Sequence, residues 1–376
     1  MKKFWGGWRR HALAKVLGLS LAGLLLLTGC GQDGASSGGS GSSAQQAAQG
    51  DTVNIGVGYQ IPTAQTWGVL IVKHEHLFEK YLKEADPDHE YAIEWSNSAS
   101  GPPLTNNMVA GKLQLALMGD MPILINGEQG QKSQNYQSVF LAFDGKGAGG
   151  KNQAIMQPTD KDLTIDDLKG KTVSVPLGSS AHRMLLAALD KRGLTDDVNI
   201  VNQDVTVGMT NIEQDKVDAH ATWEPYPTLM LSKGSGKVLL DGSDTGVDYL
   251  DGVVADRKWV EANPKYAVAF LRALIEAHDF IRQHPDEAAQ IFAEETQYPL
   301  DVTQAIVKNV RFDSVIYQKD IKTLEGSRDF LKRIDKIKDI DLNKFVDDQY
   351  LKEAFKLQQK TYPSDAELSG DWLPLD

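Results

Sequence analysis

The sequence predicts an α/β protein with a helical C-terminal region. Between residues 52 and 223, short strand-like segments alternate with segments of helical period, as in α/β folds. Polar loops follow several of these strands, and α/β sheets bind ligands at that position. From Pro264 onward the spacing of apolar residues is mostly helical, so we expect extra helices after the last strand.

The strands are predicted from short apolar or alternating segments that end at turn residues. The first, Thr52–Gly58, alternates apolar and polar residues and ends in glycine. Further strands are expected at residues 91–95, 113–117, 138–143, 152–157, 172–175, 199–202, 219–223 and 252–255. The glycine-rich segment Asp144–Lys151 is expected to be an exposed loop.

The helices are predicted from apolar residues that recur three and four positions apart. Such a pattern runs from Trp67 to Lys83. Further helices are expected at residues 103–110, 178–192, 209–216, 266–283, 284–295, 302–310 and 327–336, and after Pro122. Gly193 is expected to cap the end of the helix that precedes it.

The first 29 residues have the three zones of a signal peptide. Five basic residues precede the apolar stretch Val16–Leu27, and Thr28 and Gly29 supply small residues before Cys30. This arrangement resembles the lipobox of bacterial lipoproteins, in which the cysteine receives a diacylglycerol and becomes the N-terminus. An ordinary signal peptide is the alternative. A spanning anchor fits less well, because such a helix needs about 20 apolar residues.

Residues 30–50 are rich in glycine, serine and glutamine and predict a flexible tether to a folded part that begins near residue 51. Cys30 is the only cysteine, so its lipidation leaves no thiol for a disulfide, a metal site or a nucleophile. Removal of residues 1–29 takes away five basic and no acidic residues and changes the net charge from −12 to −17. Such an acidic chain is not expected to bind nucleic acid.

The loop Gly178-Ser179-Ser180 has the clearest features of a ligand site. It follows a predicted strand and opens a helix, so backbone N–H groups, the helix dipole and two hydroxyls favour an anion there. A serine that only caps the helix explains the same residues. Trp223 is open to two interpretations as well, since an indole at a strand exit stacks on a ligand or fills a hinge.

Two other clusters predict no chemistry. His74 and His76 are two positions apart on a predicted helix and do not share a face, so we expect no metal site. Ser179 or Ser180 with His182 lacks the Gly-x-Ser-x-Gly elbow of a nucleophilic serine, so we expect no catalytic pair.

The stretch Asp167–Leu194 (DLKGKTVSVPLGSSAHRMLLAALDKRGL) resembles the ABC-transporter solute-binding proteins of the nitrate/sulfonate/taurine family, and most closely the aliphatic-sulfonate branch. Three other stretches agree: Leu115–Pro122 (LALMGDMP), Lys216–Tyr226 (KVDAHATWEPY) and Ser100-Gly101-Pro102. The resemblance covers about Val53 to Asp286 in order.

This resemblance implies a type II periplasmic-binding fold, in which two α/β lobes joined by two crossover strands enclose a ligand cleft. Lobe 1 would consist of residues 51–146 and 256–376, and lobe 2 of residues 147–255. The crossings would lie near residues 143–154 and 253–259. The implied ligand-binding residues are Tyr59, Gln60, Ser100, Gly119, Asp120, Ser179, Ser180, His182, Trp223 and Glu224.

Two residues depart from the family pattern. Met118 replaces a threonine, which removes a hydroxyl donor and suits a larger or more apolar ligand. Glu224 replaces an aspartate and keeps the charge with a longer reach.

The implied function is that of a membrane-anchored, extracytoplasmic solute-binding lipoprotein. It would capture a small organosulfonate or related anion as a monomer, without cofactor or metal, and deliver it to an ABC permease and its ATPase. A thiamine-pyrimidine or other vitamin precursor is the alternative ligand. An enzyme is disfavoured, because the enzymatic branch with this fold carries a cysteine-rich segment and this chain has no cysteine after Cys30.

Overall fold

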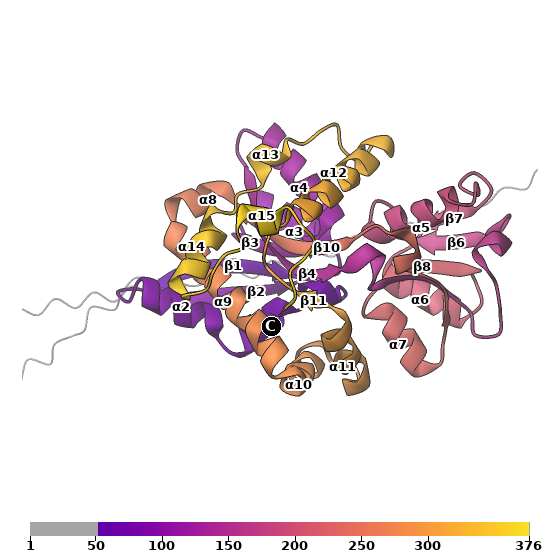
Figure 1. Ribbon diagram of the computed structural model, residues 1–376, viewed down its shortest axis with the longest axis horizontal. Helices are drawn as coiled ribbons and strands as arrows, with labels where there is room; N and C mark the ends of the chain where they lie inside the picture. Colours follow the sequence, from indigo (N-terminus) through magenta and orange to yellow (C-terminus); the bar gives the residue numbers. More distant parts are fainter. Residues whose placement is uncertain (1–51, 376) are drawn as a thin grey trace, which may run out of the picture. The chain divides into compact units, whose positions relative to one another are not determined.

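Two β-sheets organise the part of the chain that the structure describes, residues 52–375. In this computed structural model the strand orders are β11-β4-β10-β3-β1-β2 and β7-β6-β8-β5-β9 (Figure 1). The first sheet contains β1 (Thr52–Tyr59), β2 (Glu90–Asn97), β3 (Leu115–Gly119), β4 (Ser138–Gly147), β10 (Tyr249–Asp256) and β11 (Arg311–Phe312). The second contains β5 (Gln153–Gln157), β6 (Thr172–Val175), β7 (Asn199–Asn202), β8 (Ala219–Trp223) and β9 (Lys237–Asp241). We call each sheet with its helices lobe 1 and lobe 2, respectively. Cys30 and the predicted tether lie outside the described residues.

In lobe 1, β1 pairs in parallel with β2 and β3, so the carboxyl ends of these strands reach one edge of the sheet. β10 runs antiparallel between β3 and β4. The first helices of this lobe are α1 (Gly68–His74), α2 (Leu77–Ala85), α3 (Gly101–Val109), α4 (Asp120–Lys132), α8 (Arg257–Ala262) and α9 (Pro264–Gln283). α9 packs against α1 and α2 and buries Phe270 and Leu274 completely in the lobe 1 core.

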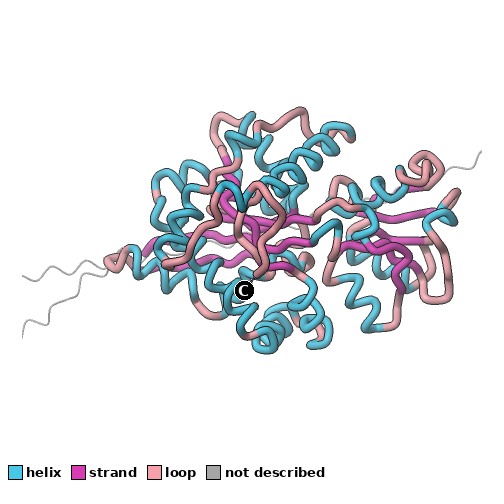
Figure 2. Tube along the Cα trace, viewed as in Figure 1, coloured by secondary structure: helices cyan, strands magenta, loops and turns pink. Residues whose placement is uncertain are grey.

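In lobe 2, β6 pairs in parallel with β7 and β8, and β5 pairs antiparallel with β8 and β9. Its helices are α5 (Ser180–Asp190), α6 (Val205–Glu213) and α7 (Tyr226–Lys233). Ile155 packs in one core with Leu185, whereas its neighbour Met156 packs in a second core with Met230. Because successive strand residues face opposite sides, helices cover both faces of this sheet (Figure 2).

The chain after α9 is mostly helical. It contains α10 (Pro285–Thr296), α11 (Leu300–Asn309), α12 (Gln318–Arg333), α13 (Leu342–Phe345), α14 (Gln349–Leu357) and α15 (Asp365–Leu368). α12 contacts both α4 of lobe 1 and α5 of lobe 2. The helical C-terminal region therefore reaches the boundary between the lobes.

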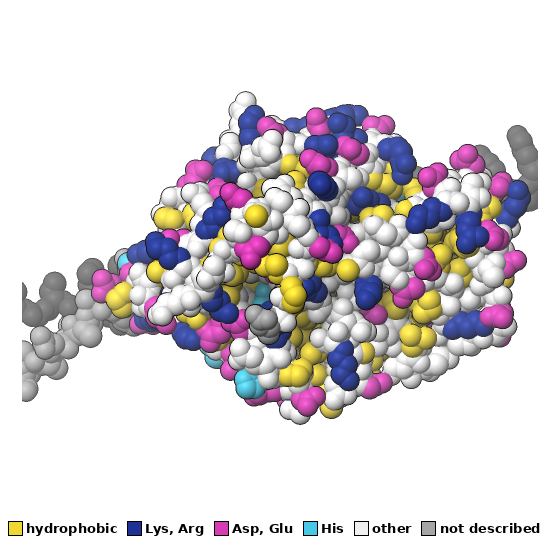
Figure 3. Space-filling view, in the orientation of Figure 1, with side chains coloured by type: hydrophobic (Ala, Val, Ile, Leu, Met, Phe, Trp, Pro, Cys, Tyr) yellow, Lys and Arg dark blue, Asp and Glu magenta, His cyan; other side chains and the backbone are white. Residues whose placement is uncertain are grey.

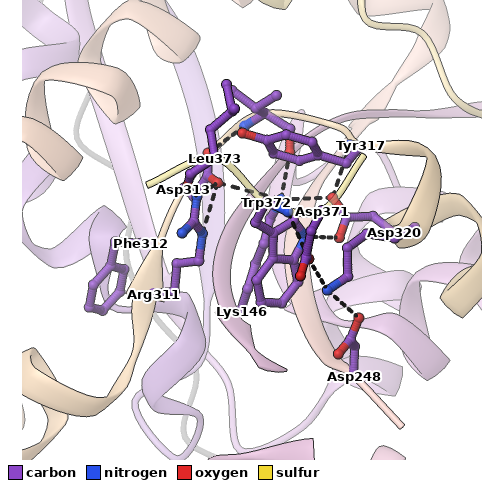
Figure 4. Close-up of polar contacts among 12 residues, drawn as sticks. Lys146, Asp248, Arg311, Phe312, Asp313, Tyr317, Asp320, Asp371, Trp372 and Leu373 are labelled. Atoms are coloured by element: carbon purple, nitrogen blue, oxygen red, sulfur yellow. Dashed lines mark hydrogen bonds and ion pairs between the residues drawn. The ribbon is translucent and has the colours of Figure 1, made fainter. Parts of the chain in front are cut away.

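A buried lysine fixes the C-terminal segment near the point where β4 leaves lobe 1. The ammonium of Lys146 donates to Asp320 Oδ2 at 2.7 Å and to the Val315 carbonyl at 2.6 Å (Figure 4). It also lies 5.4 Å from the centre of the Trp372 ring, whose Nε1 donates to Asp320 Oδ1 at 2.7 Å. Burial of this charge is offset by its carboxylate, carbonyl and aromatic partners.

Most predicted elements are confirmed, with several differences. The helix predicted from Trp67 to Lys83 is divided between α1 and α2, because His76 adopts a left-handed φ of +51°. The prediction missed α7, α8, α13, α14, α15, β9 and β11, and it placed the start of α12 at residue 327 instead of 318. The exposed loop predicted at Asp144–Lys151 is wrong, because residues 144–147 complete β4 and are buried. A Cβ on Gly145 would lie 2.5 Å from the Gln65 carbonyl, so this glycine permits close packing rather than a turn.

The second connection between the lobes lies earlier than predicted. The chain leaves lobe 1 after Gly147 and returns before Tyr249, whereas the return was expected near residues 253–259, with lobe 2 extending to residue 255. β10 belongs to lobe 1 along its whole length, since Tyr249 pairs with Gly147 and Asp251 pairs with Gly119. The sequence pattern predicted only residues 252–255 of β10, which begins three residues earlier, at Tyr249.

The described surface mixes charges of both signs. On the face shown in Figure 3, lysine and arginine alternate with aspartate and glutamate. This face has no continuous basic stripe of the kind that follows a nucleic-acid backbone. Among the described helices, none has the length and hydropathy that crossing a bilayer requires.

Candidate functional site

A cavity of about 500 Å³ lies between the two lobes. Lobe 1 and its C-terminal region contribute Gln60, Thr63, Ser100, Gly101, Pro102, Thr105, Asn106, Gly119, Pro122, Ile125, Gln129, Tyr249 and Lys336. Lobe 2 contributes Pro176, Leu177, Gly178, Ser179, Ser180, Asn202, Asp204 and Trp223. Gln60, Gly119, Pro176, Asn202 and Trp223 end or directly follow β1, β3, β6, β7 and β8, so the cavity lies at the carboxyl ends of strands from both sheets.

The loop between β6 and α5 forms the lobe 2 side of the cavity. Gly178 has a φ of +86°, which glycine adopts without a steric cost. Ser179 is the N-cap of α5, and its Oγ accepts a hydrogen bond from the His182 backbone N–H at 3.2 Å. Ser179 and Ser180 therefore present the positive end of the α5 dipole to the cavity.

His182 supports this loop from behind and does not line the cavity. Its Nδ1 accepts a hydrogen bond from the Gly178 backbone N–H at 3.2 Å, and its ring packs edge-on against Phe330. Burial, together with the charges of Lys336 and Arg333, lowers the pKa of His182 to about 4. The imidazole is therefore neutral near pH 7 and holds the loop in shape.

Asp120 joins the two lobes behind the cavity. Its carboxylate accepts hydrogen bonds from Ser180 Oγ of lobe 2, from Ser327 Oγ of α12 and from the Met121 backbone N–H. Arg183 of α5 donates to the same Ser327 hydroxyl at 2.6 Å. Burial raises the pKa of Asp120 above its usual range. This residue contacts the other lobe rather than the cavity.

Trp223 and Glu224 also connect the lobes, but only Trp223 lines the cavity. The indole Nε1 donates to the Pro62 carbonyl at 2.9 Å and to Thr63 Oγ1 at 3.2 Å. The carboxyl group of Glu224 accepts from the backbone N–H and the hydroxyl of Thr228, at 3.2 and 2.9 Å. Burial raises the pKa of Glu224 to about 7.

The first loop of lobe 1 places one residue in the cavity and its neighbour outside it. Gln60 lines the cavity, is 4% exposed, and its Oε1 has no hydrogen-bond partner among the described residues. Tyr59 instead packs edge-on against Trp95. Ser100 lines the cavity just before α3, where Gly101 leaves room for Pro122.

The ten predicted ligand-binding residues therefore form two layers. Those that line the cavity are Gln60, Ser100, Gly119, Ser179, Ser180 and Trp223. Those that lie outside its lining are Tyr59, Asp120, His182 and Glu224. Met118 is completely buried in the lobe 1 core and does not line the cavity, so it has no direct bearing on ligand size.

Sequence reasoning missed two informative lining residues, Tyr249 and Lys336. Lys336 is the one lysine or arginine among the described residues that line the cavity. It follows α12 in a segment dense with charged residues, which gives no local signal of a site. Within residues 52–375, no three potential metal-ligating side chains come together.

Comparison with known proteins finds relatives among solute-binding proteins. Residues 151–288 match a family model described as NMT1/THI5 like. A putative aliphatic sulfonates-binding protein of Bacillus subtilis (strain 168) is 28% identical over 92% of this chain and 98% of its own length. The taurine-binding periplasmic protein of Escherichia coli (strain K12) is 25% identical over 63% of this chain and 69% of its own length.

The fold agrees with these relatives. The alkanesulfonate-binding protein SsuA from Xanthomonas axonopodis pv. citri bound to MOPS superposes with a TM-score of 0.66 at 21% identity, over 78% of this chain and 98% of that chain. The predicted periplasmic-binding fold is confirmed. The predicted resemblance to the nitrate/sulfonate/taurine solute-binding proteins is also confirmed, and these three relatives are binding proteins, not enzymes.

Proposed function

We propose that this relative of the sulfonate-binding proteins is the extracytoplasmic solute-binding component of an ABC importer. It captures a small organosulfonate, such as taurine or an alkane- or arylsulfonate, or a related anion, and delivers it to a membrane permease. The observation that carries the proposal is the cavity between the lobes, into which the Gly178–Ser180 loop presents the N-terminus of α5.

The hydrogen-bonding state of the lobe 2 side chains supports an anionic headgroup. Ser179 Oγ accepts from the His182 backbone N–H, so its own O–H remains available to donate to a ligand. Asn202 Oδ1 accepts from the Leu177 backbone N–H at 3.0 Å, which leaves the amide N–H groups of Asn202 as donors. Ser180 differs, because its O–H already donates to Asp120.

The rest of the cavity suits an organic body. Trp223, Tyr249, Ile125 and Leu177 contribute aromatic and aliphatic surface. A volume of about 500 Å³ lies within the range of small-molecule sites and exceeds what the two-carbon chain of taurine fills. Longer alkanesulfonates and arylsulfonates are therefore the favoured members of the class.

Isothermal titration calorimetry on the purified folded part tests the proposal. The panel consists of taurine, alkanesulfonates of increasing length, arylsulfonates, MOPS, nitrate and a hydroxymethylpyrimidine. We expect at least one sulfonate to bind with micromolar or tighter affinity, and affinity to rise with the apolar body. Failure of every sulfonate to bind would contradict the proposal.

A neutral vitamin precursor is the second candidate, because a pyrimidine ring would stack on Trp223 and would need no positively charged side chain for its binding. The charge of the ligand separates the two candidates. Ser179→Asp places a carboxylate at the N-terminus of α5. We expect this change to abolish binding of an anion and to leave binding of a neutral ring largely intact.

We also propose that Cys30 carries the lipid that holds the protein, as a monomer, at the outer face of the cell membrane beside its permease. Support comes from the sequence of residues 1–30, which lie outside the described residues. Globomycin treatment and the Cys30→Ala change should each alter the processing of the precursor, which is measured as a change in its gel mobility and in its release from the cell. Unchanged processing under both conditions would contradict this part of the proposal.

A further inference from the structure

We propose that Lys336 is the residue that recognises the ligand's negative charge. The turn after α12 places the Lys336 ammonium near residues Gly178–Ser180 of lobe 2, which we call the anion loop. The site for the ligand's charged headgroup is thus formed by both lobes. This inference rests on the proposed function and assigns the charge specificity of the same cavity to a residue outside every recognised motif.

The position of Lys336 supports this role. It lines the cavity, and its side chain extends across Gly178. A Cβ built on Gly178 would lie 3.4 Å from Cε, 3.8 Å from Cδ and 3.7 Å from Cγ of Lys336. The ammonium is one bond beyond Cε, so it lies near the loop that opens α5. Its charge also reaches His182, whose pKa it helps to lower.

Lobe 1 holds the backbone of this turn. Asp335 adopts a left-handed φ of +58°, and the Lys336 backbone N–H donates to the Leu331 carbonyl at 2.9 Å. Ile337 and Ile340 are 3% and 2% exposed in the lobe 1 core. Glu128 of α4 accepts hydrogen bonds from the backbone N–H groups of residues 338 and 339. The ammonium is thus presented by an anchored turn rather than by a loose loop.

The charge of Lys336 is not neutralised by a carboxylate among the described residues. The neighbouring lysines are paired, since Lys332 lies 3.2 Å from Asp339 and Lys338 lies 3.0 Å from Asp335. Lys336 forms no ion pair within 4.0 Å in the described chain. Asp204, the one carboxylate that lines the cavity in the described chain, caps α6 by accepting from the Thr206 backbone N–H. Lys336 is exposed where it lines the cavity, and a cation there without a protein partner attracts an anionic ligand by its charge.

The chemistry that this arrangement recognises is a compact headgroup with one negative charge and several acceptor oxygens. Lys336 meets it from lobe 1, while the Ser179 hydroxyl and the Asn202 amide meet it from lobe 2. A sulfonate has three oxygens in a tetrahedral arrangement and can turn one toward each of these three groups. A carboxylate has two oxygens in one plane, so it cannot face all three groups with equally good geometry, which lowers its affinity.

The test compares Lys336→Met and Lys336→Arg with a matched control, Lys338→Met. Lys338 lies two residues away, is exposed and does not line the cavity. Binding is measured by calorimetry at several salt concentrations with one arylsulfonate, its carboxylate and phosphonate analogues and its neutral sulfonamide. Thermal unfolding of each variant confirms that it is folded.

We expect Lys336→Met to weaken sulfonate binding roughly 10-fold, because the variant loses the one lysine or arginine that lines the cavity in the described chain and its charged hydrogen bond to the ligand. Its affinity should also lose most of its salt dependence, while sulfonamide binding should change less than threefold. Lys336→Arg should retain most of the affinity, and Lys338→Met should behave as the wild type. Equal sulfonate affinity in the wild type and Lys336→Met would overturn the inference.

The panel separates failure of this inference from failure of the proposed function. If the wild type binds a sulfonate and Lys336→Met binds it equally well, only the inference fails. If the wild type binds a carboxylate or phosphonate but no sulfonate, and Lys336→Met loses that binding, the sulfonate proposal fails and the inference holds. If no anion binds to the wild type, both fail.

Discussion

The two sides of the cleft are built in different ways. Lobe 2 forms its anion loop from three consecutive residues, Gly178 to Ser180, which a strand and a helix place together. Lobe 1 and its C-terminal region form their side from residues that are far apart in the chain, such as Gln60, Tyr249 and Lys336. The difference teaches that a local helix N-terminus supplies the dipole, whereas the full charge and the shape of the site depend on the tertiary fold.

The largest effect is expected at Trp223, where the two sides meet. Trp223→Ala removes the aromatic surface of the cavity and the hydrogen bonds from Nε1 to Pro62 and Thr63. We expect ligand affinity to fall about 30- to 100-fold, which is typical of a buried aromatic anchor. Calorimetry with the tightest-binding member of the ligand panel measures the change.

Trp223→Phe separates the two contributions of this residue. The phenyl ring retains the stacking surface but cannot donate to the Pro62 carbonyl. If the aromatic ring makes the larger contribution, the ligand affinity of Trp223→Phe should fall less than tenfold. A fall in affinity as large as that of Trp223→Ala would instead assign the effect to the hydrogen bonds from Nε1 to Pro62 and Thr63.

The next comparison is between two adjacent serines of the anion loop. Ser179→Ala removes the hydroxyl that remains free to donate to a ligand, and a hydrogen bond to a charged group accounts for roughly a 10- to 100-fold change in affinity. Ser180→Ala removes a hydroxyl that already donates to Asp120. We expect this second variant to lose about 1 kcal/mol of stability but less than threefold in affinity.

Both serine variants are compared by calorimetry and by urea unfolding. Ser179→Ala also removes the N-cap of α5, so a loss of about 1 kcal/mol in stability is expected in that variant too. The distinguishing result is therefore affinity. Weaker binding by Ser180→Ala than by Ser179→Ala would reverse the assignment of the donor.

A smaller effect is expected from pH, through the buried carboxyl group of Glu224. Burial raises its pKa from 4.5 to about 7, so the folded protein binds this proton more tightly than the unfolded chain does. This contribution to stability is fully present below pH 4.5 and is lost as the pH rises through 7. Above that pH, Glu224→Gln should be more stable than the wild type by about 1–3 kcal/mol.

The free energy of unfolding, measured by urea titration from pH 5 to pH 8, tests this prediction. The difference between Glu224→Gln and the wild type should grow in favour of the variant as the pH rises. Glutamine keeps one oxygen that accepts from Thr228 and replaces the other with an amide NH2 group, so the pH dependence of the difference, and not its size alone, reports the charge. A pH-independent difference would show that Glu224 does not titrate in this range.

The sequence patterns predicted the elements whose apolar residues recur regularly. They did not predict elements whose formation depends on packing in the folded chain. The strands β6 and β8 alternate or run apolar between turn residues and were located to the residue. α7 was missed because prolines 225 and 227 suggest a turn, although proline suits the first turn of a helix. β9 is short and only half-buried, so its pattern was weak.

The same limit applies to the site. Motif resemblance located loops that line the cavity, since Ser179, Ser180 and Trp223 are all part of its lining. It did not reveal which side chain of each loop faces the cavity, because that depends on the partners each one finds in the folded chain. Glu224 turns to Thr228 and His182 turns to Gly178. A resemblance between motifs thus predicts which loops lie near the cavity more reliably than which side chains line it.

The smallest effects come from the adjacent pair Tyr59 and Gln60, which tests whether facing the cavity decides a residue's role. Gln60→Ala removes an amide that lines the cavity and has an oxygen without a partner in the described chain. We expect a loss of about 3- to 10-fold in affinity, as for one neutral hydrogen bond. Tyr59→Phe changes only a hydroxyl outside the lining and should alter affinity less than twofold.

Calorimetry with one sulfonate on both variants completes the comparison. The result also tests whether lobe 1 contributes hydrogen bonds to the ligand, since Gln60 lines the cavity from lobe 1. If Tyr59→Phe weakens binding more than Gln60→Ala, the phenol must reach the ligand in solution, and the present division into lining and supporting residues would be wrong. If Gln60→Ala alone weakens binding, lobe 1 contributes directional hydrogen bonds as well as the charge of Lys336.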